Sequence, residues 1–434
     1  MKYLLQPSSH LRGAFRVPGD KSISHRSIML GSLAEGVTEV EGFLEGEDAL
    51  ATLQAFRDMG VKIDGPAKGR VTIHGVCLHG LQQPSKALDL GNSGTSMRLM
   101  AGLMAGQRFD GEMIGDESLS KRPMERVAKP LRSMGAVIES TGDKGTPPLV
   151  VRGGKKLHGI HYDMPMASAQ VKSSILLAGL YADGETSVTE PAPTRDHTER
   201  MLQGFGCQVS VNGATATVRG GQTLKATQID IPADISSAAF FMVGASIAPN
   251  SDITLQHVGI NPTRTGVIDI LRLMGANIEL LNQREVGGEP VADIRVRSAQ
   301  LRGIEIPEEL VPLAIDEFPV LFVAASCAEG KTVLRGAEEL RVKESDRIQV
   351  MADGLHTLGV DAQPTPDGMV IYGGKMGGGT VGSHHDHRIA MSFAIASLRA
   401  SETITIEGCD TVATSFPGFV ELSKMAGLNI QAVV

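Results

Sequence analysis

The sequence predicts a two-domain α/β protein built from six similar units. Its 434 residues exceed the size at which a single hydrophobic core usually stops growing, so two domains are expected. A short pattern recurs roughly every 70 residues: an amphipathic helix, a glycine and a stretch of alternating apolar residues. A second helix, apolar on all sides, accompanies each copy. The six copies form two groups of three.

The glycine in each copy predicts where a helix ends and a strand begins. A glycine just after a helix adopts the left-handed conformation that closes the last turn without a steric penalty. The alternating residues that follow it, as in GVKI, are typical of a strand. The glycines that we expect at helix ends are Gly60, Gly135, Gly206, Gly275, Gly359 and Gly427.

The second helix of each unit is rich in Ala, Ser, Met and Leu and carries almost no charge after its first turn. Helices of this kind are buried. Polar residues gather at their starts, where unpaired backbone N–H groups and the helix dipole favour anions. Several such starts directed at one cleft would form an anion-binding surface. The expected starts lie near Lys21, Thr95, Ser168, Ser236, Glu317 and Arg388.

Cations at these helix starts indicate an anionic ligand. Polar residues there often serve only as N-caps. Lys21, Arg26, Arg98 and Arg388 fit that role poorly, because a cation at a helix N-terminus opposes the dipole. The segment PGDKSISHR (18–26) resembles a phosphate clamp, but the sequence has neither a GxxxxGK[ST] loop nor a GxGxxG turn after a strand. A bound nucleotide therefore has little support.

Composition narrows the class of protein further. Lys and Arg total 41 against 49 Asp and Glu, a net charge of −8, which disfavours a nucleic-acid or membrane-surface role. The four cysteines include no CxxC pair, which argues against a disulfide framework or a zinc site and fits a reducing cytoplasm. The N-terminal residues lack the apolar core of a signal peptide, and no apolar run is long enough to span a bilayer. We therefore expect a cytoplasmic protein that binds no nucleic acid or membrane, with a monomer as the default state.

Two segments of the second half carry candidates for proton transfer. IDEFPVL places Asp316 at the front of an apolar helix, and RVKESDR (341–347) surrounds Glu344 with cations. Charge runs are commonly solvated surfaces. Carboxylates beside lysines and arginines also suit proton transfer on an anionic substrate.

Other charged residues have ordinary alternatives. Arg122 and Arg195, each taken alone, could be solvated surface charges. The stretch SHHDHR (383–388) allows a metal site, but adjacent loop histidines rarely converge and Arg388 would repel a divalent cation. We therefore predict no metal.

Seven motifs together resemble the 5-enolpyruvylshikimate-3-phosphate synthase family along essentially the whole chain. They are PGDKSISHR, GNSGTSMR, GDESLSKRPM, SAQVKS, IDEFP, RVKESDR and DHRIAMSF, and they occur in the family's order. The resemblance implies an α/β fold with two inverse α/β barrel domains and six βαβαββ repeats, three per domain. It implies one domain of residues 1–17 plus 232–434, a second of 18–231, and hinge crossings near 17–20 and 229–234.

By this resemblance the 5-hydroxyl of shikimate 3-phosphate adds to C2 of phosphoenolpyruvate while C3 is protonated, and phosphate then leaves. Asp316 matches the proton acceptor, Glu344 the proton donor to C3, and Lys21 a partner in acid–base work and charge stabilisation. No metal or organic cofactor is required. Both substrates are anionic, so electrostatic interactions should dominate, and domain closure on the substrates is expected.

The resemblance also implies two sets of substrate ligands. Those for shikimate 3-phosphate are Lys21, Ser22, Arg26, Ser168, Ala169, Gln170, Arg195, Asp316 and Lys343. Those for phosphoenolpyruvate are Lys21, Gly94, Arg122, Gln170, Arg347 and Arg388. Arginine forks suit both carboxylate and phosphate groups.

Departures from the family pattern narrow the subgroup. SAQVKS and RDHTER resemble the subgroup that includes glyphosate-tolerant members, and Ser415 stands where the better-known subgroup has a lysine. Gly94 stands where tolerant members carry alanine. We therefore expect glyphosate to compete with phosphoenolpyruvate.

Two alternative functions use the same type of fold. A UDP-N-acetylglucosamine enolpyruvyl transferase relies on a loop cysteine, and none of the four cysteines here lies in a comparable Gly-rich basic loop. A non-catalytic protein that binds phosphosugars or RNA ends could be built from the same repeats. Such a protein would not need Asp316 or Glu344.

Overall fold

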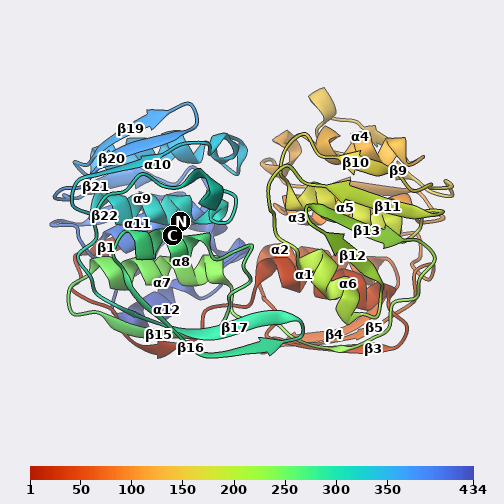
Figure 1. The fold of residues 1–434 in the computed structure, drawn as a ribbon, viewed down its shortest axis with the longest axis horizontal. Helices are drawn as coiled ribbons and strands as arrows, with labels where there is room; N and C mark the ends of the chain where they lie inside the picture. The colour runs from red at the N-terminus through yellow and green to blue at the C-terminus, as the bar shows by residue number, and fades with distance from the viewer. The chain divides into compact units, whose positions relative to one another are not determined.

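The computed structural model describes all residues of the chain, 1–434, and divides them into two compact units. Unit 1 comprises Met1–Pro18, Pro232–Glu285 and Pro290–Val434, and unit 2 comprises Gly19–Ile231 and Val286–Glu289. Each unit has its own hydrophobic core. Both ends of the chain belong to unit 1 (Figure 1).

Unit 2 contains six α-helices and three four-stranded sheets. The helices are α1 (Lys21–Leu33), α2 (Glu47–Asp58), α3 (Gly94–Ala105), α4 (Glu125–Ser133), α5 (Ala169–Gly179) and α6 (His197–Gly204). The strands are β3 (Val37–Glu41), β4 (Lys62–Ala67), β5 (Arg70–His74), β6 (Leu88–Asp89), β7 (Gly111–Ile114), β8 (Val137–Ser140), β9 (Leu149–Arg152), β10 (His161–Asp163), β11 (Glu185–Thr189), β12 (Val209–Asn212), β13 (Thr215–Arg219) and β14 (Gln228–Asp230).

Unit 1 repeats this organisation with six helices and three sheets, one of them three-stranded. The helices are α7 (Ile235–Ile247), α8 (Gly266–Leu273), α9 (Phe318–Ser326), α10 (Arg347–Thr357), α11 (His387–Ala396) and α12 (Phe419–Ala426). The strands are β1 (Lys2–Gln6), β2 (Arg12–Phe15), β15 (Asp252–Gly259), β16 (Asn277–Val286), β17 (Glu289–Arg297), β18 (Lys331–Leu334), β19 (Asp361–Thr365), β20 (Gly368–Tyr372), β21 (Gly379–Gly382), β22 (Ile404–Glu407) and β23 (Asn429–Val433).

The sheets share one pairing pattern. In five of the six, an edge strand runs parallel to its neighbour, and that neighbour pairs antiparallel with the next strand, as in β14-β3-β5-β4. In the three-stranded sheet β18-β20-β19 a parallel bridge between Glu305 and Val333 stands where the fourth strand would be. The predicted α/β architecture with six repeats is therefore confirmed.

The helices that end at the predicted glycines are the outer, amphipathic ones, and the other helix of each repeat is buried. All six predicted glycines have positive φ, from 80° at Gly206 to 128° at Gly427, where a side chain would strain the backbone. A strand follows each within a few residues. Every residue of α7 and α9 is buried, because these helices are apolar on all sides.

The inner helices begin where the sequence predicts. The starts observed are at Lys21, Gly94, Ala169, Ile235, Phe318 and His387, each within one residue of the expected position. In unit 1 the inner helices α7, α9 and α11 pack on one another, and in unit 2 α3 packs on α5 (Figure 1). Three helix starts are thus available in each unit to hold polar side chains.

In each unit, a strand from near the start of its sequence pairs with a strand from near its end. β1, from the start of the chain, lies between β22 and β23, from its end. β14 returns to pair with β3, which completes unit 2. The turn of the β16–β17 hairpin, Val286–Glu289, belongs to unit 2 although both strands belong to unit 1. No helix is both long and apolar enough to cross a membrane.

Candidate active site

In unit 2, Lys21 stands at the first position of α1, where Asp20 caps the helix by accepting a 2.9 Å hydrogen bond from the backbone N–H of Ile23. The Lys21 Nζ lies 2.5 Å from Oδ2 of Asp48, a buried residue in the first turn of α2. Asp48 therefore supplies a counter-charge that holds the ammonium group in place at the helix start.

Arg26 lies one turn further along α1 and is 4% exposed. Its Nε donates to Thr198 Oγ1 over 2.7 Å, its Nη2 to Ser173 Oγ over 2.9 Å and its Nη1 to the Ser22 carbonyl over 2.9 Å. Hydroxyl groups from α5 and α6 thus fix a buried guanidinium that sequence analysis assigns to a phosphate group.

Arg195 and Ser168 are further residues of unit 2 that are predicted to bind shikimate 3-phosphate. The Nη1 of Arg195 donates to Ser22 Oγ over 3.4 Å, so this arginine lies beside the start of α1. Ser168 is the N-cap of α5 and accepts a 3.3 Å hydrogen bond from the N–H of Val171. Ala169 is the first residue of α5. The structure thus brings Ser22, Arg26 and Arg195 together and places Ser168 and Ala169 at the neighbouring helix start.

Of the residues of unit 2 that are predicted to bind phosphoenolpyruvate, Gly94, Arg122 and Gln170 lie at the start of α3. Arg122 donates to Asn92 Oδ1 over 3.0 Å, which orients its guanidinium. Gln170 bridges two α3 residues: its Oε1 accepts from Arg98 over 2.6 Å and its Nε2 donates to Thr95 over 2.9 Å. These contacts bring the guanidinium groups of Arg98 and Arg122 close to the start of α3.

Gly94, the first residue of α3, allows these two arginines to approach the helix start. A Cβ atom at this position would lie 2.9 Å from Arg98 Nη1 and 3.0 Å from Arg122 Nη1. Any side chain here would therefore displace at least one guanidinium group. The glycine is needed for space, because its φ lies outside the left-handed region.

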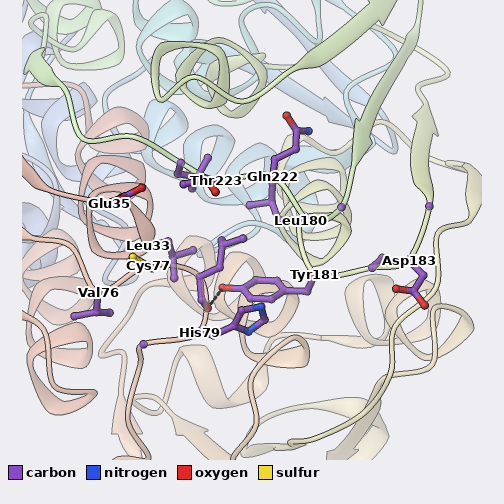
Figure 2. Close-up of a pocket in the computed structure, with 17 residues that line it drawn as sticks. Leu33, Glu35, Val76, Cys77, His79, Leu180, Tyr181, Asp183, Gln222 and Thr223 are labelled. Atoms are coloured by element: carbon purple, nitrogen blue, oxygen red, sulfur yellow. Dashed lines mark hydrogen bonds between the residues drawn. The ribbon is translucent and has the colours of Figure 1, made fainter.

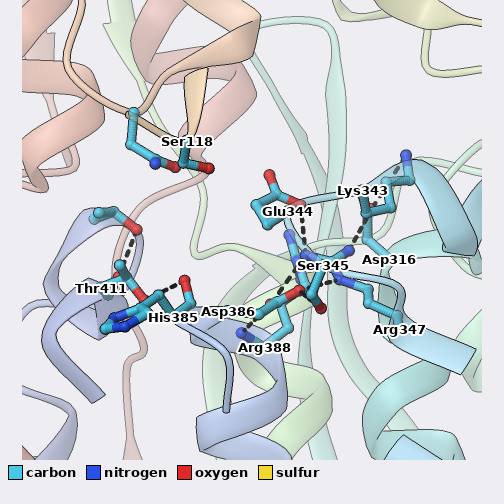
Figure 3. A network of polar contacts seen from close by, with 12 residues as sticks. Ser118, Asp316, Lys343, Glu344, Ser345, Arg347, His385, Asp386, Arg388 and Thr411 are labelled. Atoms are coloured by element: carbon cyan, nitrogen blue, oxygen red, sulfur yellow. Dashed lines mark hydrogen bonds and ion pairs between the residues drawn. The ribbon is translucent and has the colours of Figure 1, made fainter. Parts of the chain in front are cut away.

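In unit 1, Arg347 is the centre of a cluster of carboxylates (Figure 3). It begins α10 and is 1% exposed. Its Nε lies 2.9 Å from Asp386 Oδ2, its Nη2 lies 2.8 Å from Glu344 Oε2, and its Nη1 lies 3.5 Å from Asp316 Oδ1. Both carboxylates that sequence analysis assigns to proton transfer therefore contact one buried cation.

Asp386 is the innermost of these carboxylates and has no exposed surface. It accepts hydrogen bonds from Ser345 Oγ over 2.8 Å and from the backbone N–H of Arg388 over 3.0 Å, as the N-cap of α11. Burial alone would raise its pKa, but the charge of Arg347 holds the pKa of Asp386 below its usual value. Burial would likewise lower the pKa of Arg347, and the charges of Asp386, Glu344 and Asp316 raise it instead.

Two further cations of unit 1 lie near this cluster. The Lys343 Nζ is 3.8 Å from Asp316 Oδ1 and 3.6 Å from Glu339 Oε1. The side chain of Arg388 is half-buried at the second position of α11 and makes no ion pair or hydrogen bond. A half-buried guanidinium with no protein partner is suited to an anionic ligand.

The histidine stretch is not arranged as a metal site. Asp386 is directed at Arg347, whereas His385 Nδ1 lies 3.8 Å from Asp410 on another segment. No group of three or more His, Cys, Asp or Glu side chains in the chain is placed to hold a metal ion.

Sequence reasoning missed two of the residues described above. Asp48 has no distinctive signal, because an acidic residue in the first turn of a helix is common whatever its partner. Asp386 was visible only as a member of the histidine stretch, and its role as the counter-ion of Arg347 depends on two segments 39 residues apart in sequence.

Unit 2 also contains a pocket of about 720 Å³ that does not suit an anion (Figure 2). It lies at the C-terminal ends of α1 and α5, where the helix dipole is negative. Glu35 and Asp183 line it, and no lysine or arginine does. Cys77, the exposed cysteine, is also here, at the opposite end of α1 from Lys21.

Solved structures with the same fold show which class of protein this chain resembles in its architecture. The enolpyruvyl transferase NikO from Streptomyces tendae shares it with a TM-score of 0.79 over 99% of this chain and 98% of that chain, at 16% sequence identity. EPSP synthase from Acinetobacter baumannii is closer, with a TM-score of 0.90, 63% identity and 99% of both chains covered. The two-domain inverse α/β barrel fold is therefore the one adopted here.

Sequence comparison then identifies the family. Residues 5–422 match the family model of EPSP synthase (3-phosphoshikimate 1-carboxyvinyltransferase). A 3-phosphoshikimate 1-carboxyvinyltransferase from Alkalilimnicola ehrlichii is 69% identical over 431 residues, which are 99% of this chain and 96% of that protein. The chain belongs to the EPSP synthase family.

Proposed function

We propose that this chain transfers the enolpyruvyl group of phosphoenolpyruvate to the 5-hydroxyl of shikimate 3-phosphate, giving 5-enolpyruvylshikimate 3-phosphate and phosphate. The reaction belongs to the shikimate pathway, which leads to the aromatic amino acids. The observation that carries the assignment of roles is the contact of buried Arg347 with both Asp316 and Glu344. Family membership over nearly the whole chain supports the choice of substrates.

In this proposal Asp316 accepts the proton of the 5-hydroxyl as its oxygen adds to C2 of phosphoenolpyruvate. Arg347 and Lys343 lie beside the Asp316 carboxylate and hold it in position for this step. Glu344 donates a proton to C3. Glu344 then takes a proton back from the new methyl group as the C2–O bond to phosphate breaks, and Asp316 gives its proton to the departing phosphate, so atoms and charge balance without a metal or an organic cofactor.

Cations of both units neutralise the substrates. Shikimate 3-phosphate is bound by Lys21, Ser22, Arg26, Arg195 and Lys343. Its ring contacts the start of α5 at Ser168, Ala169 and Gln170.

Phosphoenolpyruvate is bound by Lys21, Arg122, Arg347 and Arg388, beside Gly94 and Gln170. The guanidinium groups of Arg26, Arg122 and Arg347 are already oriented by protein hydrogen bonds, which reduces the reorganisation that the reaction requires.

Phosphate release from purified protein tests this function. Release should require both substrates, should be unaffected by EDTA and should disappear in the Asp316→Ala variant. Absence of release from well-folded protein would contradict the proposal. Product identity, checked by mass spectrometry, would separate enolpyruvyl transfer from simple hydrolysis of phosphoenolpyruvate.

We also propose that glyphosate competes with phosphoenolpyruvate here, although two motifs resemble the subgroup with tolerant members. Gly94 supports this, because it leaves open the space that an alanine methyl would occupy next to Arg98 and Arg122. Initial rates at several phosphoenolpyruvate concentrations should show competitive inhibition. Turnover that is unchanged at high inhibitor would place the chain among the tolerant members instead.

We propose finally that the protein acts as a monomer in the cytoplasm. Four free cysteines and no disulfide fit a reducing compartment. Light scattering coupled to size-exclusion chromatography would test the monomer, and cell fractionation would test the location.

A further inference from the structure

Lys172 is a buried cation on α5 that the reaction proposed above does not use. Its Nζ lies 2.6 Å from Glu190 Oε1 and 3.1 Å from Glu199 Oε2, and its side chain is only 3% exposed. Both glutamates are also largely buried. We refer to Lys172, Glu190 and Glu199 as the lysine triad.

The lysine triad is not an efficient way to stabilise the folded protein. Removing an ion from water costs several kcal/mol, and apolar residues of the same volume often serve as well or better. Three buried charges in contact are more readily explained by a need to fix the relative position of the segments that carry them. Lys172 lies in α5, Glu199 in α6, and Glu190 just after β11.

Two neighbours of the lysine triad hold Arg26. Thr198 precedes Glu199, and Ser173 follows Lys172. Their hydroxyl groups hydrogen bond to each other over 2.7 Å, and both accept hydrogen bonds from the Arg26 guanidinium. The Lys172–Glu199 contact therefore sets the spacing of α5 and α6 at the point where Arg26 is anchored.

Glu190, the third member of the lysine triad, is connected to Arg195 through Thr194. Glu190 Oε1, which binds Lys172, also accepts a hydrogen bond from Thr194 Oγ1. Thr194 directly precedes Arg195, whose guanidinium reaches Ser22 at the start of α1. Glu190 thus joins the turn 190–194 to the buried lysine directly, and Thr194 is joined to it through Glu190.

We propose that Lys172 is a positioning residue for shikimate 3-phosphate: by binding Glu190 and Glu199 it holds Arg26 and Arg195 where both reach one phosphate group. This inference rests on the proposed function, which assigns that phosphate to the two arginines. Lys172 itself does not touch the substrate.

The decisive variant is Lys172→Met, which keeps the length of the side chain and removes its charge. The affinity for shikimate 3-phosphate, measured by titration calorimetry without phosphoenolpyruvate, should fall by at least about tenfold, because the two ionised glutamates then repel each other. With shikimate 3-phosphate saturating, kcat and the KM for phosphoenolpyruvate should change by less than about threefold. Lys156→Met, which removes an exposed lysine paired with Asp183, is the matched control.

The pH dependence separates positioning from a general loss of structure. In Lys172→Met the two glutamates can share a proton at low pH and repel when both are ionised, so the ratio of variant to wild-type Kd should rise from pH 6 to pH 8. Asp196, the other carboxylate that acts on Glu199, is paired with Arg200 at 3.0 Å, and Arg26 is the other cation within the network. The double variant Lys172→Met/Glu199→Gln should recover part of the affinity and lose this rise.

A milder variant keeps the inference testable if Lys172→Met does not fold. Thr194→Val leaves the lysine triad intact and cuts its connection to Arg195, so the affinity for shikimate 3-phosphate should fall by about threefold or more with unchanged thermal stability. Wild-type affinity in either variant would overturn the inference, as would equal losses for both substrates in Lys172→Met. Lack of phosphate release from the wild-type protein would instead contradict the proposed function.

Discussion

Two buried arginines among the proposed substrate ligands, Arg26 in unit 2 and Arg347 in unit 1, make different kinds of contact. Arg26 in unit 2 is held by hydroxyl and carbonyl oxygens from Ser22, Ser173 and Thr198. Arg347 in unit 1 contacts the carboxylates of Asp316, Glu344 and Asp386. The oxygens in these contacts of Arg26 are neutral, whereas those in the contacts of Arg347 are charged. The contacts of Arg347 therefore hold the carboxylates that we propose for proton transfer in unit 1, and the contacts of Arg26 orient a guanidinium that we propose binds a substrate phosphate in unit 2.

The largest effect should come from removing a carboxylate of unit 1. Asp316→Asn should lower kcat by about 10²–10⁴-fold, the usual contribution of general acid–base catalysis, with a much smaller change in the Kd for shikimate 3-phosphate. Initial rates and calorimetry measure the two quantities. Asp269→Asn, an exposed position on α8, is the control. A variant that loses affinity but keeps kcat would reverse the roles assigned to the two units.

Removing the innermost counter-ion of Arg347 should be nearly as damaging, but to stability. Asp386→Ala should lower the free energy of unfolding by about 3–5 kcal/mol, because it leaves a buried charge undercompensated. Urea denaturation measures this change. The exposed pair Asp110–Arg152 is the comparison, and Asp110→Ala should lower the free energy of unfolding much less, because water and salt screen an exposed pair. Similar losses in both variants would mean that burial of the Arg347 cluster does not make its ion pairs more important for stability than an exposed ion pair.

In unit 2 the corresponding change should affect binding rather than the chemical step. Arg26→Met should weaken shikimate 3-phosphate binding by about 30-fold or more, equivalent to about 2 kcal/mol for one lost charge-assisted pair. Calorimetric titration gives the Kd, and saturating substrate should restore most of kcat. Arg70→Met, at an exposed arginine, should leave the Kd unchanged. A fall in kcat that substrate cannot restore would argue for a catalytic role of unit 2.

A smaller effect is expected at Gly94. Gly94→Ala should raise the inhibition constant of glyphosate by about tenfold more than the KM for phosphoenolpyruvate, a difference of roughly 1.4 kcal/mol. The reason is that the new methyl group displaces the guanidinium group of Arg98 or Arg122, which reduces the space beside Gly94. Inhibition kinetics of both proteins test this. Equal increases in both constants would show that the methyl group does not discriminate between glyphosate and phosphoenolpyruvate.

The smallest effect concerns pH and the lysine triad. Burial raises the pKa of Glu199 above its usual 4.5, against the lowering effect of Lys172. Above pH 4.5 and up to the raised value, the folded protein retains a proton that the unfolded chain loses, so the free energy of unfolding falls as pH rises through this window. Glu199→Gln should reduce that slope by at most about 1.4 kcal/mol per pH unit. Urea denaturation at pH 5, 6 and 7 compares the slopes, and identical slopes would contradict the shift.

The fold was largely predictable because its signals are local. A glycine with positive φ after each outer helix, such as Gly60, and an all-apolar inner helix, such as α9, both appear within about ten residues of sequence. The excursion of Val286–Glu289 into unit 2 could not be predicted in this way. Glu289 makes a buried 2.7 Å contact with His197, 92 residues away, and no motif of the sequence links the two residues.

The site was predictable only in part, and largely through family resemblance. Motifs identified the arginines, but the residues that orient them, such as Thr198 for Arg26, are ordinary polar residues whose partners are set by tertiary contacts. Lys172 was part of a recognised motif, yet its glutamate partners come from outside that motif. The roles assigned to Asp316 and Glu344 remain predictions that the variants above will test.

The position of β1 has a consequence for how the protein is made. Because β1 (Lys2–Gln6) pairs with β22 and β23 at the other end of the chain, the first strand to leave the ribosome must wait for the last. Unit 2 has all its sheets once β14 has been synthesised, and can assemble while unit 1 lacks most of its strands. The apolar residues of β1 therefore lack their partner strands throughout translation, and the slow, non-local closure of unit 1 should determine the rate of folding.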